Sequence, residues 1–275
     1  MTLEPCPHYG RTPPCVDALL EAGVWRVVIG VLDPDPQVRG EGVARLRAAG
    51  VEVTVGLCEG EVREDLAPYL KHRSTGRPWV VLKLAATLDG RIAAPDNDSE
   101  WITGEEARAD VHRLRATSDA ILVGAGTVRA DDPRLTVRDS AGRSPLRVVL
   151  GAIPPGAQVE PALSMGGDLD TVLDELGKRD ILQLLVEGGA TVAHDFHAAG
   201  LVDRYVLYFA PALFGGDDAR SMFAGAGAST MKALWRGRLI DTERLGPDLR
   251  VELAPACADL VRNLPSSGVP STEVL

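Results

Sequence analysis

The feature that most constrains the fold is the alternation of short apolar runs with amphipathic, helix-like segments along most of the chain. The apolar runs are rich in Val, Leu and Ile and lie at 25–32, 51–56, 79–85, 119–124 and 181–187. Buried strands connected through helices form parallel sheets, because each connection must cross back over the sheet before the next strand begins. The sequence therefore predicts an α/β protein.

A polar segment with Gly and Pro, at 72–78, separates two periodic parts of the chain. Before it, the spacing predicts a charged amphipathic helix at 58–73. We expect a first domain at 1–73, a linker at 74–78, a second domain at 79–256 and a disordered tail at 257–275.

The composition narrows the class of protein. The net charge of −10 argues against nucleic acid as a general partner, although a local basic pocket for a phosphorylated metabolite remains open. No run approaches the ~18 apolar residues of a membrane span, and the N-terminus does not have the pattern of a signal peptide. The four cysteines are unevenly spaced and show no disulfide framework. A cytoplasmic enzyme for a small molecule is the simplest interpretation.

The first candidate site contains Cys6 and Cys15. Zinc deaminases bind their metal through one His or Cys and two Cys, and a separate Glu transfers the proton. The two thiolates could supply two ligands. Only five residues precede Cys6, so the His-x-Glu sequence that such a site also needs is not in this sequence. The alternative is a pair of reduced cysteines in a partial fold, with an incomplete metal site.

The second candidate site follows the apolar run at 119–124. Glycines in Gly124-Ala125-Gly126-Thr127 would let backbone N–H groups approach a phosphate, and five charged residues follow within the next eleven positions. A structural turn and a solvated loop are the alternatives. Upstream, Thr103 and Glu106 have the spacing of a capping box for a helix from Gly104 to about Ala116.

The third candidate site is Glu187-Gly188-Gly189 between a strand and a helix. A diglycine at a helix N-terminus favours pyrophosphate binding, because free N–H groups and the helix dipole both attract anions. A tight connection without a ligand is the alternative. Lys83 interrupts a buried strand, which indicates either an ion-paired structural residue or a site residue. The sequence Asp89-Gly90-Arg91 is typical of a hairpin turn.

Taken together, these motifs resemble the bifunctional riboflavin-biosynthesis deaminase/reductase family. TLEPCPHYGRTPPC resembles the C-terminal part of its zinc deaminase motif. KLAATLDGRIA, SEWITG, VGAGTVRADDPRLTVR and LVEGGATVAHDF resemble its reductase motifs, in the family's order. The reductase resemblance covers residues 77–254, and the deaminase resemblance covers 1–73.

The resemblance implies a dihydrofolate-reductase-like α/β fold, a mostly parallel sheet with flanking helices, preceded by a partial cytidine-deaminase-like α/β domain. It implies NADPH-dependent reduction of 5-amino-6-(5-phosphoribosylamino)uracil to the 5-phosphoribitylamino form, in a homodimer. The alternative is the family's other reaction, the zinc-dependent deamination of 2,5-diamino-6-(5-phosphoribosylamino)pyrimidinone. That reaction needs the half of the deaminase domain that carries the His-Ala-Glu motif, which this sequence does not include.

The resemblance also implies roles for individual residues, matched motif by motif. Asp131 would lie near the reacting carbon, orienting the opened ribose or assisting proton transfer, with Lys83 as a charged neighbour. Arg115 and Arg138 suit the substrate's phosphate, because a guanidinium group matches phosphate oxygens in a bidentate fork. The implied cofactor contacts are Ala85, Trp101, Thr127, Asp131, Gly189, Ala190, Thr191, Val192, Ala193, His194 and Asp195, and the implied substrate contacts are Ser99, Arg115, Leu135, Arg138 and Glu187.

The segment between Leu150 and Asp168 departs from the family's pattern. Gly, Pro and Ala turns stand there in place of a longer segment with a strand. That part of the family's fold commonly helps to bind the adenosine end of the cofactor. The expected preference for NADPH over NADH therefore follows from the family and not from a visible 2′-phosphate site.

Overall fold

The computed structural model describes residues 1–96, 98–137 and 144–256. These residues form two units, and the boundary along the chain lies between Gly76 and Arg77. Each unit has its own hydrophobic core, so each is described by itself. The tail predicted at 257–275 lies outside the described residues, as does Arg138.

Unit 1, which spans Met1–Gly76, is built around two short parallel strands that pair from Arg26↔Glu52 to Ile29↔Val55. One core cluster contains Val16, Ile29 and Leu46, and a second lies around Leu70. Its elements are α1 (Cys15–Glu21), β1 (Arg26–Ile29), α2 (Glu41–Ala48), β2 (Glu52–Val55), α3 (Glu59–Asp65) and α4 (Ala67–Thr75).

The single helix predicted at 58–73 is in fact two helices, α3 and α4, because Pro68 occupies the first turn of α4. Proline has no backbone N–H and clashes with the preceding turn, so a helix can begin at it but not continue through it.

The carboxylate of Glu4 organises the start of unit 1. Glu4 is 4% exposed and accepts hydrogen bonds from three backbone N–H groups, those of Asp33 at 3.3 Å, Gly40 at 3.0 Å and Val43 at 3.0 Å. It thereby caps the N-terminus of α2, whose N-cap residue is a glycine without a side chain. This function of the Leu-Glu-Pro-Cys segment was not predicted from the sequence.

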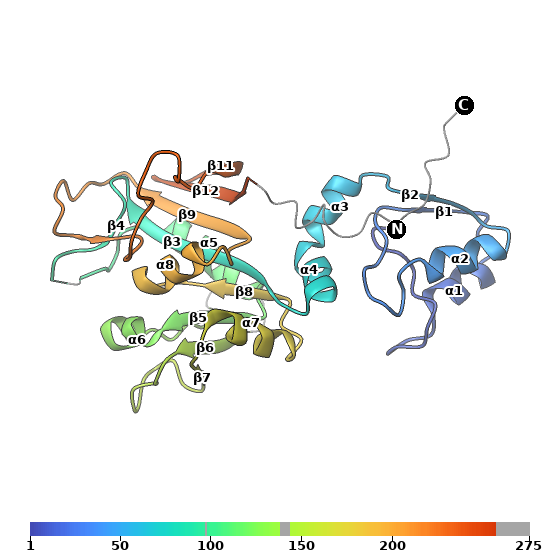
Figure 1. The fold of residues 1–275 in the computed structure, drawn as a ribbon, viewed down its shortest axis with the longest axis horizontal. Helices are drawn as coiled ribbons and strands as arrows, with labels where there is room; N and C mark the ends of the chain where they lie inside the picture. The colour runs from blue at the N-terminus through green and yellow to red at the C-terminus, as the bar shows by residue number, and fades with distance from the viewer. Residues whose placement is uncertain (97, 138–143, 257–275) are drawn as a thin grey trace. The chain divides into compact units, whose positions relative to one another are not determined.

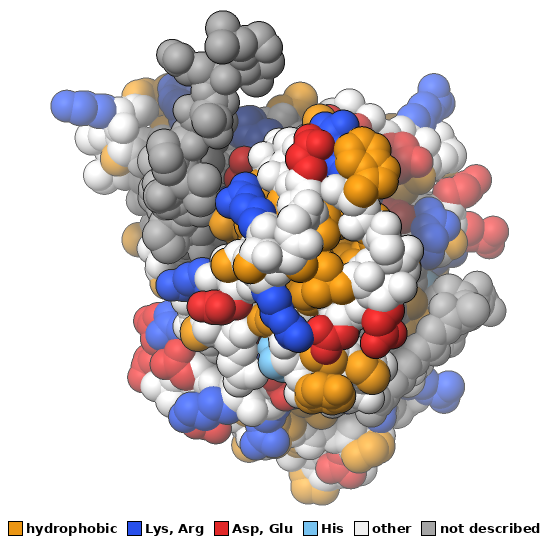
Figure 2. Space-filling view, turned by 90° about the vertical axis from the view of Figure 1, so that its right-hand side faces the viewer, with side chains coloured by type: hydrophobic (Ala, Val, Ile, Leu, Met, Phe, Trp, Pro, Cys, Tyr) orange, Lys and Arg blue, Asp and Glu red, His pale blue; other side chains and the backbone are white. Residues whose placement is uncertain are grey.

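Several large apolar side chains of unit 1 are exposed, among them Tyr9 at 78%, Trp25 at 73% and Leu57 at 62%. Figure 2 shows hydrophobic side chains interspersed with Lys, Arg, Asp and Glu on the face that it presents. Charges of both signs are mixed on that face.

Unit 2 contains a sheet of eight strands in the described residues, in the order β11-β12-β9-β3-β8-β5-β6-β7 (Figure 1). The six strands from β9 to β7 are parallel, and β12 and β11 add an antiparallel edge. The predicted α/β fold with a mostly parallel sheet and flanking helices is confirmed. The strands are β3 (Trp79–Thr87), β4 (Arg91–Ala93), β5 (Ala120–Gly124), β6 (Leu146–Leu150), β7 (Leu163–Met165), β8 (Gln183–Val186), β9 (Arg204–Ala210), β10 (Arg220–Ser221), β11 (Gly237–Leu245) and β12 (Asp248–Pro255).

The central strand β3 presents its two faces to different surroundings. Alternate residues such as Leu82 and Leu84 join the main core, with side chains from α7 and α8. The residues between them, including Lys83 and Ala85, point to the other face. The helices of this unit are α5 (Glu105–Ala116), α6 (Ala125–Asp131), α7 (Leu169–Gly177) and α8 (Ala190–Ala198).

The predicted capping box at Thr103 and Glu106 is wrong. Helix α5 has Gly104 as its N-cap, without a side-chain cap, and the Gly104 N–H instead donates to Asp248 Oδ2 at 2.7 Å. A carboxylate from a distant strand thus replaces the local cap, and no local spacing rule could find it.

Two other expectations also change. The segment after Gly124 is helix α6 rather than a loop, and the region between Leu150 and Asp168 contains the short strand β7. No helix in the described part of the chain is both long and apolar enough to cross a membrane.

Candidate active site

A cleft of about 860 Å³ opens where the parallel strands β3, β5 and β8 end. Open α/β sheets bind ligands at this edge, and the volume is in the range of small-molecule sites. The cleft brings together most of the predicted site residues, namely Lys83, Ala85, Ser99, Trp101, Arg115, Thr127, Asp131, Leu135, Glu187 and Gly189.

A buried ionic cluster forms one wall of the cleft. Arg115 donates from Nε to Glu187 Oε1 at 2.6 Å and from Nη2 to Oε2 at 2.8 Å, and Lys83 Nζ lies 3.8 Å from Oε2. The side chains of Lys83, Arg115 and Glu187 are 15%, 13% and 6% exposed. Because Arg115 also donates to the Thr136 carbonyl at 3.3 Å, it fixes both Glu187 and the segment after α6.

Protonation in this cluster follows from burial and neighbouring charge. Burial lowers the pKa of Lys83. The positive charge of Arg115 lowers this pKa further, and the negative charge of Glu187 opposes both effects. Burial alone would raise the pKa of Glu187, but Arg115 and Lys83 outweigh it, so that pKa lies below its ordinary value. Glu187 is therefore ionised at neutral pH, and Lys83 releases its proton more readily than an exposed lysine.

A second buried network lies beside Lys83. Its Nζ is 5.9 Å from the centre of the Tyr208 ring, and Tyr208 Oη donates to Asp110 Oδ2 at 2.6 Å. Arg250 Nε lies 3.2 Å from the same oxygen. Burial, followed by the bond to Asp110, raises the pKa of Tyr208 far above its ordinary value. Sequence reasoning missed this network, because its members come from α5, β9 and β12.

Helix α5 adds a basic face to the cleft that was also missed. Arg108 and His112 line it together with Arg115. The Arg108 guanidinium lies 4.7 Å from the centre of the Trp101 ring and donates to the Thr103 carbonyl at 2.6 Å. The spacing of these residues at i, i+4 and i+7 puts them on one side of a helix, so a helical projection of 105–116 would have found them.

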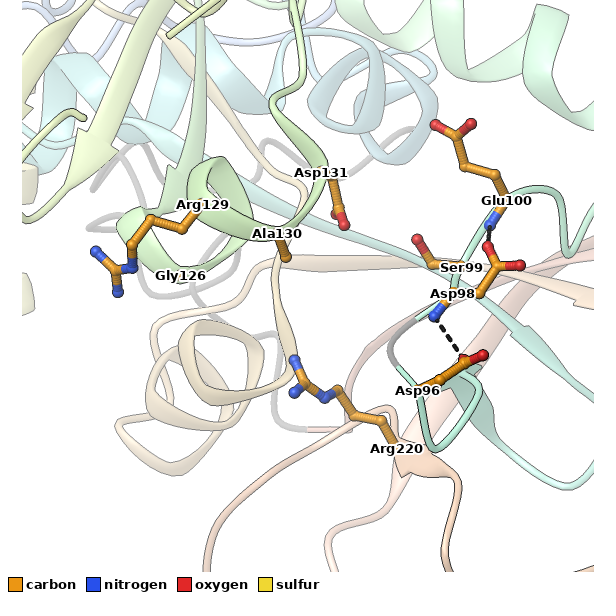
Figure 3. A pocket seen from close by; sticks show the side chains of 9 residues that line it. All are labelled: Asp96, Asp98, Ser99, Glu100, Gly126, Arg129, Ala130, Asp131 and Arg220. Atoms are coloured by element: carbon orange, nitrogen blue, oxygen red, sulfur yellow. Dashed lines mark hydrogen bonds between the residues drawn. The ribbon is translucent and has the colours of Figure 1, made fainter. Parts of the chain in front are cut away.

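Asp131 occupies the open rim of the cleft. A second cavity of about 830 Å³ adjoins it, and Ser99, Glu100, Asp131 and Arg220 line both. Figure 3 shows Asp131 on the side of the cavity formed by α6, with Ser99 and Glu100 on the loop that follows β4. Burial, followed by the charge of Glu100, raises the pKa of Asp131, and Arg220 opposes the shift. Asp131 can therefore hold a proton more readily than an exposed aspartate.

The diglycine forms a close junction between α8 and the start of α6. The Gly189 N–H donates to Thr127 Oγ1 at 2.8 Å, and a Cβ on Gly189 would lie 3.1 Å from that oxygen. No side chain caps the N-terminus of α8, so backbone N–H groups of its first turn are available to an anion.

The other residues of α8 that were expected to hold the cofactor do not line the cleft in the described structure. These residues are Ala190, Thr191, Val192, Ala193, His194 and Asp195. Ala190 and Ala193 are buried in the protein. The first-turn backbone of α8 is the part of this helix that lies nearest the cleft, through Gly189.

In unit 1, the backbone N–H of Cys15 donates to Cys6 Sγ at 3.4 Å, and a hydrogen bond with Cys6 raises the pKa of the Cys15 thiol. The two predicted ligands are thus close together. Among the described residues, no group of three or more His, Cys, Asp or Glu side chains could hold a metal ion.

The fold and the cleft define an α/β protein with a ligand site at the carboxyl ends of parallel strands. Residues 78–251 match the family model of the RibD C-terminal domain. RibD of Mycobacterium tuberculosis strain H37Rv is 44% identical over 263 residues, which cover 92% of this chain and 77% of that protein. The chain belongs to the RibD family.

Two solved structures are similar over the same extent. RibD of Acinetobacter baumannii superposes with a TM-score of 0.86 at 40% identity, covering 92% of this chain and 79% of that one. A Thermotoga maritima protein, described as a diaminohydroxyphosphoribosylaminopyrimidine deaminase/5-amino-6-(5-phosphoribosylamino)uracil reductase, superposes with a TM-score of 0.82 at 35% identity, covering 92% and 78%.

Proposed function

We propose that this chain reduces 5-amino-6-(5-phosphoribosylamino)uracil to its 5-phosphoribitylamino form in riboflavin biosynthesis, with NADPH as the reductant. Membership of the RibD family supports the reaction, and the relative from Thermotoga maritima carries this reductase in its description. The observation that supports it most in this chain is the cleft, which gathers Lys83, Asp131 and Glu187 at the ends of the parallel strands.

The residues present fit a reduced nicotinamide dinucleotide. The uncapped N-terminus of α8, held against Thr127 through Gly189, offers backbone donors to a diphosphate. Ala85 and Trp101 line the cleft where the nicotinamide would lie. When bound, the cofactor supplies a hydride, and the protein supplies position and electrostatics.

Ser99, Leu135 and Glu187, with Arg115 and Arg138, are the residues we propose for the substrate. Glu187 is ionised and fixed by two cations, so it can accept hydrogen bonds from the substrate without moving. The basic groups along α5, Arg108 and Arg115 among them, favour a phosphorylated substrate over a neutral one.

The reduction breaks the bond between C1′ and the ring oxygen of the ribose, adds a hydride to C1′ and adds a proton to that oxygen. We assign the proton donation to Asp131, because its raised pKa keeps the carboxyl protonated to a higher pH than an exposed aspartate. Lys83 lies at the floor of the cleft and holds the ribose hydroxyl groups by donating hydrogen bonds.

The test is NADPH oxidation by the purified chain, with the product identified by mass spectrometry. We expect turnover with the deaminated pyrimidine substrate and none with the still-aminated one. Cofactor binding without oxidation of NADPH in the presence of the deaminated substrate would contradict the proposal. Turnover from the aminated substrate, with zinc in the sample, would instead favour the deaminase alternative.

We also propose that the chain forms a homodimer through unit 2. Exposed apolar side chains after β9 and on the edge strand β11 support this, including Leu213 at 69%, Met231 at 76% and Leu239 at 58%. Sedimentation velocity tests it, and a monomer at micromolar concentration would contradict it.

A further inference from the structure

The segment at 211–236, which we term the arm, connects β9 to β11 and carries the short strand β10. The turn after β3 and the strand β4 anchor its first half. Asp89 Oδ2 accepts a hydrogen bond from the Gly215 N–H at 2.9 Å, and Arg91 donates to the carbonyls of Ala219 and Gly216, both at 2.9 Å. The sequence Asp89-Gly90-Arg91 is therefore more than a turn, because its two charged side chains fix the arm.

Helix α8 anchors the second half of the arm. The Ala224 N–H donates to the Ala190 carbonyl at 3.1 Å, and the ring of His197 packs against Phe223 and Trp235, with centroid distances of 5.2 Å and 5.5 Å. The arm is thus attached to the helix whose first turn we propose for the cofactor's phosphates.

Arg220 lies between these two anchors. It pairs with Ala93 of β4 in the small antiparallel sheet, its side chain is exposed, and it lines both the cleft and the adjoining cavity. Figure 3 shows its guanidinium extended from the arm toward the side of the cavity that α6 forms, whereas the side chain of Arg129 points away from Asp131.

The electrostatics of the cavity make a cation at this position significant. Asp96, Asp98, Glu100 and Asp131 also line the cavity, so its rim would repel an anion if no cation were present. The first turn of α8 contains Ala190, Thr191 and Val192, and a helix N-terminus contributes only about half an elementary charge. A diphosphate carries about two negative charges, so a cationic side chain beside the helix N-terminus would add to its binding.

We propose that Arg220 is a further cofactor-binding residue, which the arm holds in the cleft so that its guanidinium binds the phosphate groups of the dinucleotide. This inference rests on the proposed function. Guanidinium groups bind phosphate oxygens through charge-assisted hydrogen bonds, and the two anchors hold the backbone of Arg220 in place before the cofactor arrives. Binding then costs less conformational entropy than it would with a free loop.

The test compares Arg220→Gln, Arg220→Lys and the control Arg236→Gln. Arg236 is an exposed arginine of the same arm that does not line either cavity, so its substitution changes the net charge equally. The dissociation constant of NADPH is measured by calorimetry on each full-length chain at two salt concentrations. A titration with reduced nicotinamide riboside, which carries no phosphate, is the ligand control.

We expect Arg220→Gln to weaken NADPH binding about 10-fold, the lower range for a hydrogen bond to a charged group, and to reduce its salt dependence. Arg220→Lys should restore part of the loss, and Arg236→Gln should change neither quantity. Binding of the riboside should be the same in all variants.

Two results would overturn the inference. Equal NADPH affinity in Arg220→Gln and wild type would overturn this inference and leave the proposed function standing. If the pH profile of kcat shifted in that case, Arg220 would act only on Asp131. Failure of the wild-type chain to bind NADPH would overturn the proposed function and this inference with it.

Discussion

Two buried glutamates, one in each unit, are stabilised in opposite ways. Glu4 in unit 1 is bonded to three backbone N–H groups. Glu187 in unit 2 accepts two hydrogen bonds from Arg115 and forms an ion pair with Lys83. Backbone donors fixed by the fold make Glu4 a structural cap that leaves no room for a ligand. Side-chain cations at the wall of a cleft make Glu187 part of a site, because both partners also face the space where a substrate would bind.

The comparison teaches that burial of a charge does not identify function, whereas the kind of partner does. A carboxylate that accepts hydrogen bonds from backbone N–H groups has its hydrogen-bonding capacity filled within its own unit. A carboxylate held by cations keeps a charged neighbourhood whose field extends into the cleft.

The largest effect on stability is expected for Glu187→Gln. The change leaves Arg115 and Lys83 buried without their counter-charge, which typically costs about 3–5 kcal/mol of unfolding free energy. Denaturant unfolding followed by fluorescence measures the loss. Glu175→Gln on α7, whose carboxylate pairs with the exposed Lys178 at 2.8 Å, is the control and should change stability far less than Glu187→Gln does.

The pH dependence of that loss follows from the lowered pKa of Glu187. A carboxyl with a lowered pKa in the folded state contributes stability above its unfolded value, about 4.3, and loses it as the pH falls through the folded value. The stability difference between wild type and Glu187→Gln should therefore begin to shrink as the pH falls below about 4.3 and vanish below the folded-state pKa. A constant difference down to lower pH would contradict the ionised state of Glu187.

Asp131→Asn is expected to affect catalysis instead of stability. An amide cannot donate the proton to the ribose oxygen, so kcat should fall by about 100-fold or more, while the exposed position of Asp131 should leave stability nearly unchanged. Steady-state kinetics with saturating NADPH measures it. Because the pKa of Asp131 is raised and the protonated form is the donor, wild-type kcat should decline as the pH rises through that pKa. A variant with normal kcat would exclude Asp131 as the donor.

Much of the fold and part of the site could be predicted from the sequence, because they depend on local patterns. The apolar run at 79–85 predicted a strand, which is β3 (Trp79–Thr87), and the diglycine predicted the helix N-terminus of α8 at the cleft. Their order along the chain also carried the resemblance to the RibD family, which the comparisons confirm.

What could not be predicted depends on contacts between distant residues. The bond from Tyr208 to Asp110 joins positions 98 residues apart, and Arg91 reaches Ala219 across 128 residues. Spacing along the chain contains no information on such pairs. The same limit explains why the bonds of Glu4 were missed, since its partners lie 29 to 39 residues away.

Glu4→Gln should destabilise unit 1 by about 1–3 kcal/mol. The substitution replaces one acceptor oxygen with an NH2 group, which is itself a donor and cannot accept from the backbone N–H that faces it. Since the partners of Glu4 all lie in unit 1, the affinity for NADPH should not change. Far-UV circular dichroism during denaturation measures the first quantity and calorimetry the second, with exposed Glu21→Gln as the control. A large loss of NADPH affinity would contradict the purely structural role of Glu4.

The smallest effect is expected for Tyr208→Phe. This substitution tests Asp110, a carboxylate that has both a neutral hydrogen-bond donor and cationic partners. Asp110 accepts from the Tyr208 hydroxyl but also pairs with the guanidinium groups of Arg113 and Arg250, so one neutral donor is lost and the charge remains paired. The expected cost is about 1 kcal/mol, seen as a lower denaturation midpoint. The aromatic ring beside Lys83 remains in Phe, so kcat should stay near the wild-type value. A fall in kcat that exceeds the loss of stability would show that the hydroxyl positions Lys83 through the buried network, and would place Asp110 with Glu187 as part of the site.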